Sequence, residues 1–355
     1  MNVLYVTRAL NQKISDGGLE VSKRNLTFLK ALYGEQNVSI FEVPHPNILH
    51  KLLNMLSKRG YGVTNEITKK FKKIIKGKFN FIFFNGSLYG SLVKIAYLEN
   101  VKSLVFFHNI ERNYYYDRYK TSKNLISYLY YLYMSRNELF SVMYGNFLCV
   151  ISSRDEKELF SIYGKQVDFI LPITMEQKDI KKVAEKHDKV VCLFVGSNFF
   201  PNQQGMDWFI EKVLPEVDIK LVVAGSICNY LQHQHGLNEK IDYKGYVDDL
   251  SKVYTESNCV VSPIFYGSGM KTKTIEAFAY GKTFIGTDEA FAGIECSYED
   301  VGAKCNTVQE FVNQISLIDC DKMFNVNSYN LFMQKFDSSN KLKELSGFLI
   351  SKKLL

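Results

Sequence analysis

The sequence lacks a long apolar run, a cysteine pair of metal-binding spacing and a dinucleotide-binding glycine motif. The longest apolar stretch of note, 125–134, is about half of the ~20 residues that cross a bilayer. The amino terminus has neither the basic flank nor the apolar core of a signal peptide, so we expect a cytoplasmic protein. No GxGxxG follows a strand-like run, which argues against a dinucleotide dehydrogenase.

The seven cysteines are scattered and include no CxxC pair. This pattern predicts buried free thiols in a reducing compartment, with neither a disulfide framework nor a zinc site. We therefore expect no bound metal.

The length of the chain predicts two domains. A single core stops growing at roughly 250–300 residues, whereas this chain has 355. Hydrophobic residues make up 46% of the sequence, which is enough apolar material for two cores.

The positive charge is concentrated in one segment. The whole chain has a net charge of +7, but 51–78 alone has nine basic residues and one acid, a net charge of +8. Such a block attracts phosphates of anionic lipid, nucleic acid or a polyphosphorylated substrate. A solvated helix face is the alternative. No nucleic-acid-binding motif accompanies the block, so we expect no nucleic-acid partner.

Short apolar runs alternate with helical patterns in two successive series. The runs expected to be strands are 2–7, 37–43, 78–85, 101–108 and 146–152 in the first series and 190–196, 219–225, 241–247, 259–264 and 283–287 in the second. This alternation predicts α/β units in which parallel sheets are covered on both faces. A polar stretch without apolar runs, 174–189, separates the series and is expected to be a linker. The predicted organisation is one α/β domain at 1–173, a second at 190–335, and a helix at 336–355 that packs back on the first domain.

The segment 265–287, FYGSGMKTKTIEAFAYGKTFIGT, carries the clearest chemistry. Gly267, Ser268 and Gly269 follow a strand and let backbone approach a ligand. The helix beyond them offers unpaired N–H groups, to which Lys271 and Lys273 add charge, and this combination predicts a diphosphate site.

Glu276 lies further along the same helix. A carboxylate at this position can accept two hydrogen bonds from a ribose diol. An ordinary exposed helix carboxylate is the alternative.

This segment resembles the nucleotide-binding helix of retaining GT-B glycosyltransferases of the "glycosyl transferases group 1" family (family 4-like). Further segments fall in the order of that family: 15–26, 106–119, 150–160, 194–217, 221–225, 243–264 and 287–295.

The resemblance implies a GT-B architecture, in which two Rossmann-like domains face each other across a cleft. It makes 1–173 the acceptor-side domain and 190–335 the nucleotide-sugar-binding domain. It also implies transfer of a sugar from a nucleotide diphosphate sugar to an acceptor hydroxyl, with retention and without metal or other cofactor. Lys271 would stabilise the leaving diphosphate together with the amides at 268–270. The expected donor-binding residues are Gly17, Gly18, Gly196, Gly267, Ser268, Gly269, Met270, Lys271 and Glu276.

The sequence departs from the family pattern at two positions. Ser268 stands where many members have the first of two acids, eight positions before the second. The turn at 196–205 has no basic residue, although many members place Arg and Lys there to hold the diphosphate. Lys271 is expected to take over that charge.

His108 ends an apolar strand, and ligands bind at the carboxyl ends of strands in open α/β sheets. The resemblance implies that this histidine is catalytic and lies near the reacting sugar; a core histidine is the alternative. The same resemblance places the loop of Gly17 and Gly18 near donor and acceptor, against the alternative of a plain turn.

Two other functions stay open. A nucleotide-sugar epimerase shares the architecture, and a non-catalytic glycan-assembly subunit would be consistent with Ser268. For the transferase, we expect a surface polysaccharide or glycoconjugate as product. The acceptor is then a growing glycan, carried on a lipid diphosphate at the inner face of an anionic membrane.

Overall fold

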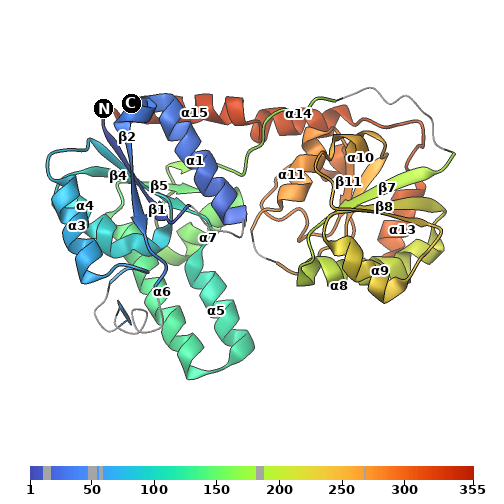
Figure 1. The fold of residues 1–355 in the computed structure, drawn as a ribbon, viewed down its shortest axis with the longest axis horizontal. Coiled ribbons are helices and arrows are strands. Elements are labelled where there is room, and N and C mark those ends of the chain that lie inside the picture. The colour runs from blue at the N-terminus through green and yellow to red at the C-terminus, as the bar shows by residue number, and fades with distance from the viewer. Residues whose placement is uncertain (11–16, 47–53, 56–58, 181–187, 268) are drawn as a thin grey trace. The chain divides into compact units, whose positions relative to one another are not determined.

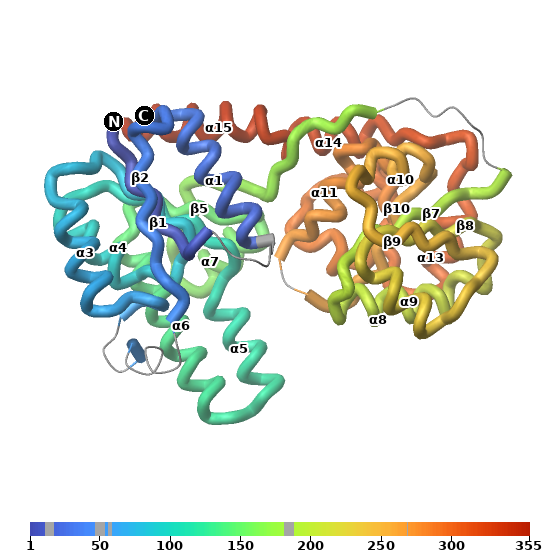
Figure 2. The backbone as a smooth tube through the Cα atoms, in the orientation of Figure 1, coloured from blue at the N-terminus to red at the C-terminus, as the bar shows by residue number. Residues whose placement is uncertain are grey.

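The computed structural model describes residues 1–10, 17–46, 54–55, 59–180, 188–267 and 269–355. Part of the basic segment, part of the expected linker and Ser268 lie outside the described residues. The chain forms two compact units, Met1–Pro172 with Leu342–Leu355 and Ile173–Lys341. A parallel sheet with helices forms the centre of each (Figures 1 and 2).

The first unit is built on a six-stranded parallel sheet in the order β2-β1-β3-β4-β5-β6. Strand β1 lies between β2 and β3, with Val3 beside Val38 on one side and Phe81 on the other. The strands are β1 (Val3–Arg8), β2 (Val38–Val43), β3 (Phe81–Phe84), β4 (Lys102–Phe107), β5 (Phe147–Val150) and β6 (Phe169–Ile170).

Helices cover the faces of this sheet, which explains why every residue of β3 is buried. The end of the chain belongs to this unit, where the Phe348 ring stacks on Phe169 with centroids 5.0 Å apart. The helices are α1 (Gly17–Tyr33), η1 (Glu35–Asn37), α3 (Asn65–Ile75), η2 (Ser87–Tyr89), α4 (Gly90–Leu98), α5 (Glu111–Ser122), α6 (Leu125–Tyr144), α7 (Ser153–Tyr163) and most of α15 (Ser338–Ser351).

The second unit is also built on six parallel strands, in the order β12-β11-β10-β7-β8-β9. The strands are β7 (Val190–Val195), β8 (Ile219–Ala224), β9 (Ile241–Gly245), β10 (Cys259–Ser262), β11 (Thr283–Gly286) and β12 (Gly302–Lys304). The helices are α8 (Phe200–Trp208) with its continuations η3 (Phe209–Val213) and η4 (Leu214–Glu216), α9 (Ile227–His235), α10 (Ser251–Thr255), α11 (Thr272–Ala279), α12 (Tyr298–Val301), α13 (Val308–Ser316) and α14 (Val326–Lys335).

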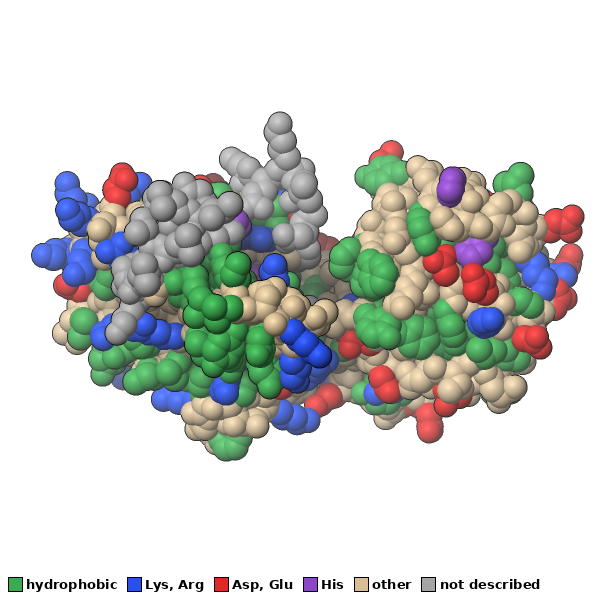
Figure 3. Space-filling model, turned by 90° about the horizontal axis from the view of Figure 1, so that it is seen from below, with side chains coloured by type: hydrophobic (Ala, Val, Ile, Leu, Met, Phe, Trp, Pro, Cys, Tyr) green, Lys and Arg blue, Asp and Glu red, His purple; other side chains and the backbone are tan. Residues whose placement is uncertain are grey.

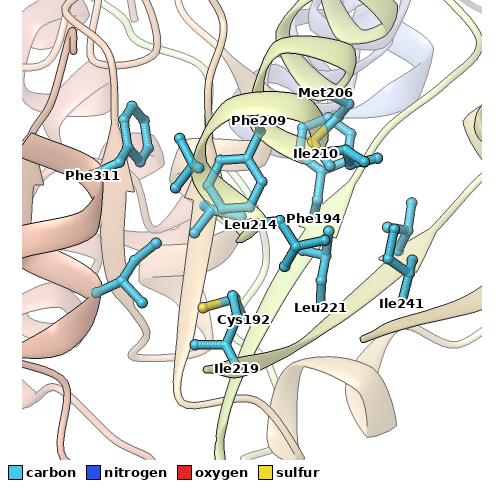
Figure 4. Packing of buried hydrophobic residues seen from close by; sticks show 14 of the residues in the cluster. Cys192, Phe194, Met206, Phe209, Ile210, Leu214, Ile219, Leu221, Ile241 and Phe311 are labelled. Atoms are coloured by element: carbon cyan, nitrogen blue, oxygen red, sulfur yellow. The ribbon is translucent and has the colours of Figure 1, made fainter. Parts of the chain in front are cut away.

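Two apolar clusters cover the two faces of the second sheet. Because side chains alternate along a strand, β7 sends Cys192 and Phe194 into one cluster and Val191 and Leu193 into the other. Figure 4 shows the first cluster, in which Phe194 and Met206 lie beside the sheet with Phe209 and Phe311. The expectation of two parallel α/β units is confirmed, and all seven cysteines are free.

A buried carboxylate in the first unit joins four elements. Glu138 of α6 accepts the backbone N–H groups of Glu111 at 2.6 Å and Arg112 at 3.3 Å, which begin α5. It also accepts the Tyr163 hydroxyl at 2.8 Å and the Ser87 hydroxyl at 3.4 Å. Glu138 therefore caps α5 from another helix and fixes the chain just beyond β4.

A second carboxyl group lies close to the first. Burial raises the pKa of Glu111 to about 8, and the neighbouring charge of Glu138 adds to the rise. A carboxyl group whose pKa is raised by folding stabilises the protein fully below its unfolded pKa. That contribution is lost as the pH rises through the folded pKa. Glu111 therefore makes the first unit less stable between about pH 4.5 and pH 8.

We expect Glu111→Gln to remove this pH dependence, because an amide carries no charge into the buried site. The variant should match the parent near pH 4.5 and exceed its free energy of unfolding at pH 8 by about 1–3 kcal/mol. Chemical denaturation at both pH values measures the difference. The exposed Glu99→Gln serves as the matched control and should leave the pH slope unchanged. Equal slopes for Glu111→Gln and the parent would contradict the prediction.

Candidate functional site

The order of strands reverses at the centre of the second sheet. The chain leaves β7 toward β8 and β9 on one side, then returns at β10, on the other side of β7, and continues to β11. The loops that follow β7 and β10 therefore diverge at the carboxyl edge. Open α/β sheets bind ligands at such a point. The loop after β7 contains Gly196, and the loop after β10 contains 267–271. Most of the residues expected to bind the donor lie in these two loops.

Close backbone packing shapes the turn after β7. The Gly196 N–H donates to the Ala224 carbonyl at 2.9 Å. A Cβ added to Gly225, whose φ is +106°, would lie 2.2 Å from the Gly196 carbonyl oxygen. Only glycine fits at Gly225, because a side chain there would clash with the backbone of the turn at Gly196.

The loop after β10 ends at a helix whose N-terminus is uncapped by a side chain. Gly267 and Gly269 have φ of +152° and +69°, in the region that glycine favours. Helix α11 begins at Thr272, and the side chain of its N-cap residue, Lys271, makes no capping hydrogen bond. Unsatisfied first-turn N–H groups are the usual anion ligands at a helix N-terminus.

Lys271 is held beside the glycine loop by a carboxylate. Its Nζ lies 2.6 Å from Glu289 Oε1 and donates to the Gly269 carbonyl at 2.8 Å. A Cβ on Gly267 would lie 3.3 Å from the same Nζ, so the loop and the lysine are in contact. Glu289 follows β11 and was not among the site residues predicted from the sequence.

Lys273 reaches the turn after β7. Its Nζ donates to Asn202 Oδ1 at 2.8 Å and lies 4.1 Å from the centroid of the Phe194 ring. Burial lowers the pKa of Lys273 from 10.5 to about 7, and the charge of Lys271 lowers it further. The turn at 196–205 has no basic residue of its own, but the fold brings this lysine to it from α11.

Glu276 lies one turn further along α11 and is mostly buried, with 18% of its side chain exposed. It accepts the Tyr254 hydroxyl at 3.2 Å, and Lys178 Nζ lies 3.8 Å away. Burial raises the pKa of Glu276, and Lys178 partly offsets the rise. These contacts distinguish it from an ordinary exposed helix carboxylate. Lys178 comes from the stretch expected to be a linker.

Met270 is also expected to bind the donor. It is partly buried against the apolar cluster that contains Phe278. Gly196, Gly267, Gly269, Lys271 and Glu276 thus share the carboxyl edge of one sheet with it.

In the first unit the strand order reverses between β1 and β3. Gly17 begins α1, and the Gly18 carbonyl accepts the Ser22 hydroxyl at 2.6 Å. That hydroxyl also accepts from Asn85 Nδ2 at 2.7 Å, which ties α1 to the end of β3. Asn85 is a buried amide at the end of the apolar run 78–85 and was not predicted from the sequence.

His108 directly follows β4 at the same edge. It is partly exposed, and its ring meets Phe106 edge-on with centroids 4.9 Å apart. It therefore differs from a fully buried core histidine.

Neither a metal-binding cluster nor a membrane-spanning helix is found in the described part of the chain. None of its clusters of His, Cys, Asp or Glu is arranged to hold a metal ion. No helix within it combines the length and the apolar character that spanning a membrane requires.

Residues 189–318 match the family model described as Glycosyl transferases group 1. The matched segment runs from the start of β7 to just beyond α13. It therefore contains the Gly196 turn, the 267–271 loop, both lysines and Glu276. A search of curated proteins finds no match to the chain.

Solved structures match over nearly the whole chain. HepE from Anabaena in complex with UDP has a TM-score of 0.68 at 13% identity, covering 99% of this chain and 100% of that one. The same protein with UDP-glucose has a TM-score of 0.63 at 13% identity, with coverage of 99% and 100%. A glycosyltransferase from Rickettsia africae ESF-5 has a TM-score of 0.62 at 15% identity, with 98% of each chain covered. The chain therefore has the GT-B fold, and within its second unit residues 189–318 resemble the glycosyl transferases group 1 family.

Proposed function

We propose that the protein transfers a sugar from a nucleotide diphosphate sugar to an acceptor hydroxyl with retention at the anomeric carbon. One observation carries the proposal. Two lysines and two glycine loops meet at the strand reversal of the unit that matches the family model. The HepE structures of the same fold hold UDP and UDP-glucose, which supports a nucleotide diphosphate as the ligand.

The main demand of the reaction is stabilisation of negative charge on the leaving diphosphate. Lys271 provides one charge beside the 267–271 loop, and Lys273 provides a second at the Gly196 turn. The first-turn amides of α11 and the positive end of its dipole add to both. In the retaining reaction that we propose, the leaving phosphate oxygen takes the proton of the attacking acceptor hydroxyl. No protein nucleophile is then required.

Glu276 is proposed to bind the ribose of the donor. Its carboxylate keeps acceptor capacity beyond its contacts with Tyr254 and Lys178, because an ionised carboxylate has about four lone-pair sites. We assign Gly17, Gly18 and His108 of the first unit to the transferred sugar and the acceptor.

The acceptor is proposed to be a growing surface glycan on a lipid diphosphate at the cytoplasmic face of a membrane. The described part of the basic segment supports this location. Helix α3 exposes Lys69, Lys70, Lys72 and Lys73 while burying Phe71 and Ile75. Exposed lysines on one amphipathic helix attract anionic lipid within a Debye length.

A thermal-shift screen of nucleotide sugars, followed by product analysis, tests the function. A donor at 100 times its Kd should stabilise the protein by about 2.7 kcal/mol. Product should form only with both donor and acceptor present. Conversion of the donor alone would indicate an epimerase, and binding without conversion would indicate a non-catalytic subunit.

Glu276→Ala is expected to weaken nucleotide diphosphate binding by about 1–3 kcal/mol, the range for a lost charged hydrogen bond. Isothermal titration of the folded variant measures the loss. Glu289→Gln serves as a second variant, since it leaves the ribose contact in place. Unchanged nucleotide affinity in folded Glu276→Ala would remove the ribose assignment.

Lys273 should make nucleotide binding depend on pH. Its lowered pKa, about 7, must rise when a diphosphate binds beside it, so binding takes up a proton. Affinity should fall as the pH increases from 7 to 9, and Lys273→Met should remove that dependence. Titration in two buffers of different ionisation enthalpy at pH 8 measures the uptake, which should be at most about one proton.

Lys271→Ala provides the contrast for this experiment. It should lower turnover at saturating donor by about tenfold or more while leaving proton uptake in place, because charge develops beside it in the transition state. If Lys271→Ala keeps full turnover and Lys273→Met loses it, then Lys273 and not Lys271 stabilises the leaving diphosphate.

His108→Ala should lower transfer at least about tenfold, or about 1.4 kcal/mol of transition-state stabilisation. Nucleotide diphosphate affinity should stay unchanged, and the melting temperature should stay within a few degrees, because the ring is partly exposed. Transfer per folded molecule and melting temperature are measured on the same preparation. A destabilised variant with normal transfer would assign His108 to packing instead.

A further inference from the structure

Helices α5 and α6 form a hairpin that extends away from the first sheet (Figure 1). Lys123, with φ of +49°, makes the turn, and Asn124 caps α6 by accepting the Ser127 N–H. None of the residues 116–132 at the tip of the hairpin is buried. Only the second half of α6 packs into the core, so the tip is an exposed element.

Tyrosines hold the two helices of the tip together. The rings of Tyr116 and Tyr131 lie with centroids 5.2 Å apart, and those of Tyr119 and Tyr128 are also 5.2 Å apart. These contacts occupy the facing sides of α5 and α6. The aliphatic side chains of the tip are therefore not needed to close the hairpin.

The aliphatic side chains form an exposed stripe on α6. Leu125, Leu129 and Leu132 follow the spacing of one helix face. Leu125 and its neighbour Ile126 are each 71% exposed, and Leu129 and Leu132 are 42% and 45% exposed. In Figure 3, hydrophobic side chains gather over this hairpin with Lys and Arg side chains beside them. Contiguous apolar exposure of this kind marks an interaction surface.

Basic residues surround the turn. Arg118, Lys120 and Lys123 outnumber the single acid, Asp117, in 116–124. All four are exposed. Two copies of this positive patch would repel each other in a symmetric dimer, in which the same surface meets itself. The positive charge instead complements an anionic surface.

We propose that the hairpin tip, 116–132, docks the protein on an anionic phospholipid bilayer. The stripe enters the boundary between headgroups and acyl chains, the tyrosines lie at the headgroup level, and the three cations meet lipid phosphates. The inference rests on the proposed membrane location and names the surface that inserts. Helix α3 supplies only longer-range attraction.

Vesicle co-sedimentation without donor or acceptor tests the proposal. The vesicles are pure phosphatidylcholine, or the same lipid with phosphatidylglycerol. The parent should bind the anionic vesicles more tightly, and Leu125→Ser with Ile126→Ser should lower the partition coefficient at least about tenfold. The matched control is Leu237→Ser with Leu317→Ser, since these leucines are 92% and 75% exposed in the second unit. This control should bind like the parent.

Three results would overturn the inference. The first is equal binding by the hairpin variant and the parent, and the second is equal loss in the leucine control. The third is a dimer in light scattering that the hairpin variant converts to monomer, since that would assign the surface to a second copy. Nucleotide affinity of the hairpin variant is measured separately and should equal that of the parent. Failure of docking is thereby distinguished from failure of the transfer function.

Discussion

The reversal of strand order between β7 and β10 is the constraint on which the candidate site depends. Parallel strands bring their carboxyl ends to one edge, and apolar clusters fill both faces of the sheet. At the reversal, successive loops turn away from each other and leave room between them. The strand order of the first unit reverses in the same way between β1 and β3, where the Asn85 side chain donates a hydrogen bond to Ser22 of α1.

The two lysines at the start of α11, Lys271 and Lys273, have different electrostatic surroundings. Lys271 is balanced by Glu289, whereas the Lys273 contacts, Asn202 and the Phe194 ring, are both uncharged. Burial lowers the pKa of Lys273 because desolvation disfavours the charged form. A diphosphate bound beside it would raise that pKa again. The charge of Lys273 is thus unfavourable before the ligand binds and becomes favourable once a diphosphate lies beside it. This supports a lysine pair in place of the basic residues that the turn after β7 lacks.

The sequence predicted the elements whose signals are local. Buried strands appear as continuous apolar runs, and the glycine loop predicted the start of α11. Two edge strands, β6 and β12, were not predicted because they have two and three residues, all only partly buried. Contacts between distant residues were also missed: Lys273 meets Asn202 across 71 positions, and Glu289 meets Lys271 across 18. Such pairings follow from strand order, which spacing along the chain does not encode.

Glu138 caps the helix that joins the two parts of the first unit to which we assign functions: the segment of His108 after β4 and the hairpin tip, 116–132. Its carboxylate holds the first amides of α5, at Glu111 and Arg112, only a few residues beyond His108. The same helix, α5, continues to the exposed hairpin tip and is joined to α6 through pairs of tilted tyrosine rings. Because Glu138 is fully buried in the core, it holds the first turn of α5 in place. Under the proposed docking, the exposed tip can then meet the lipid surface without moving the segment after β4.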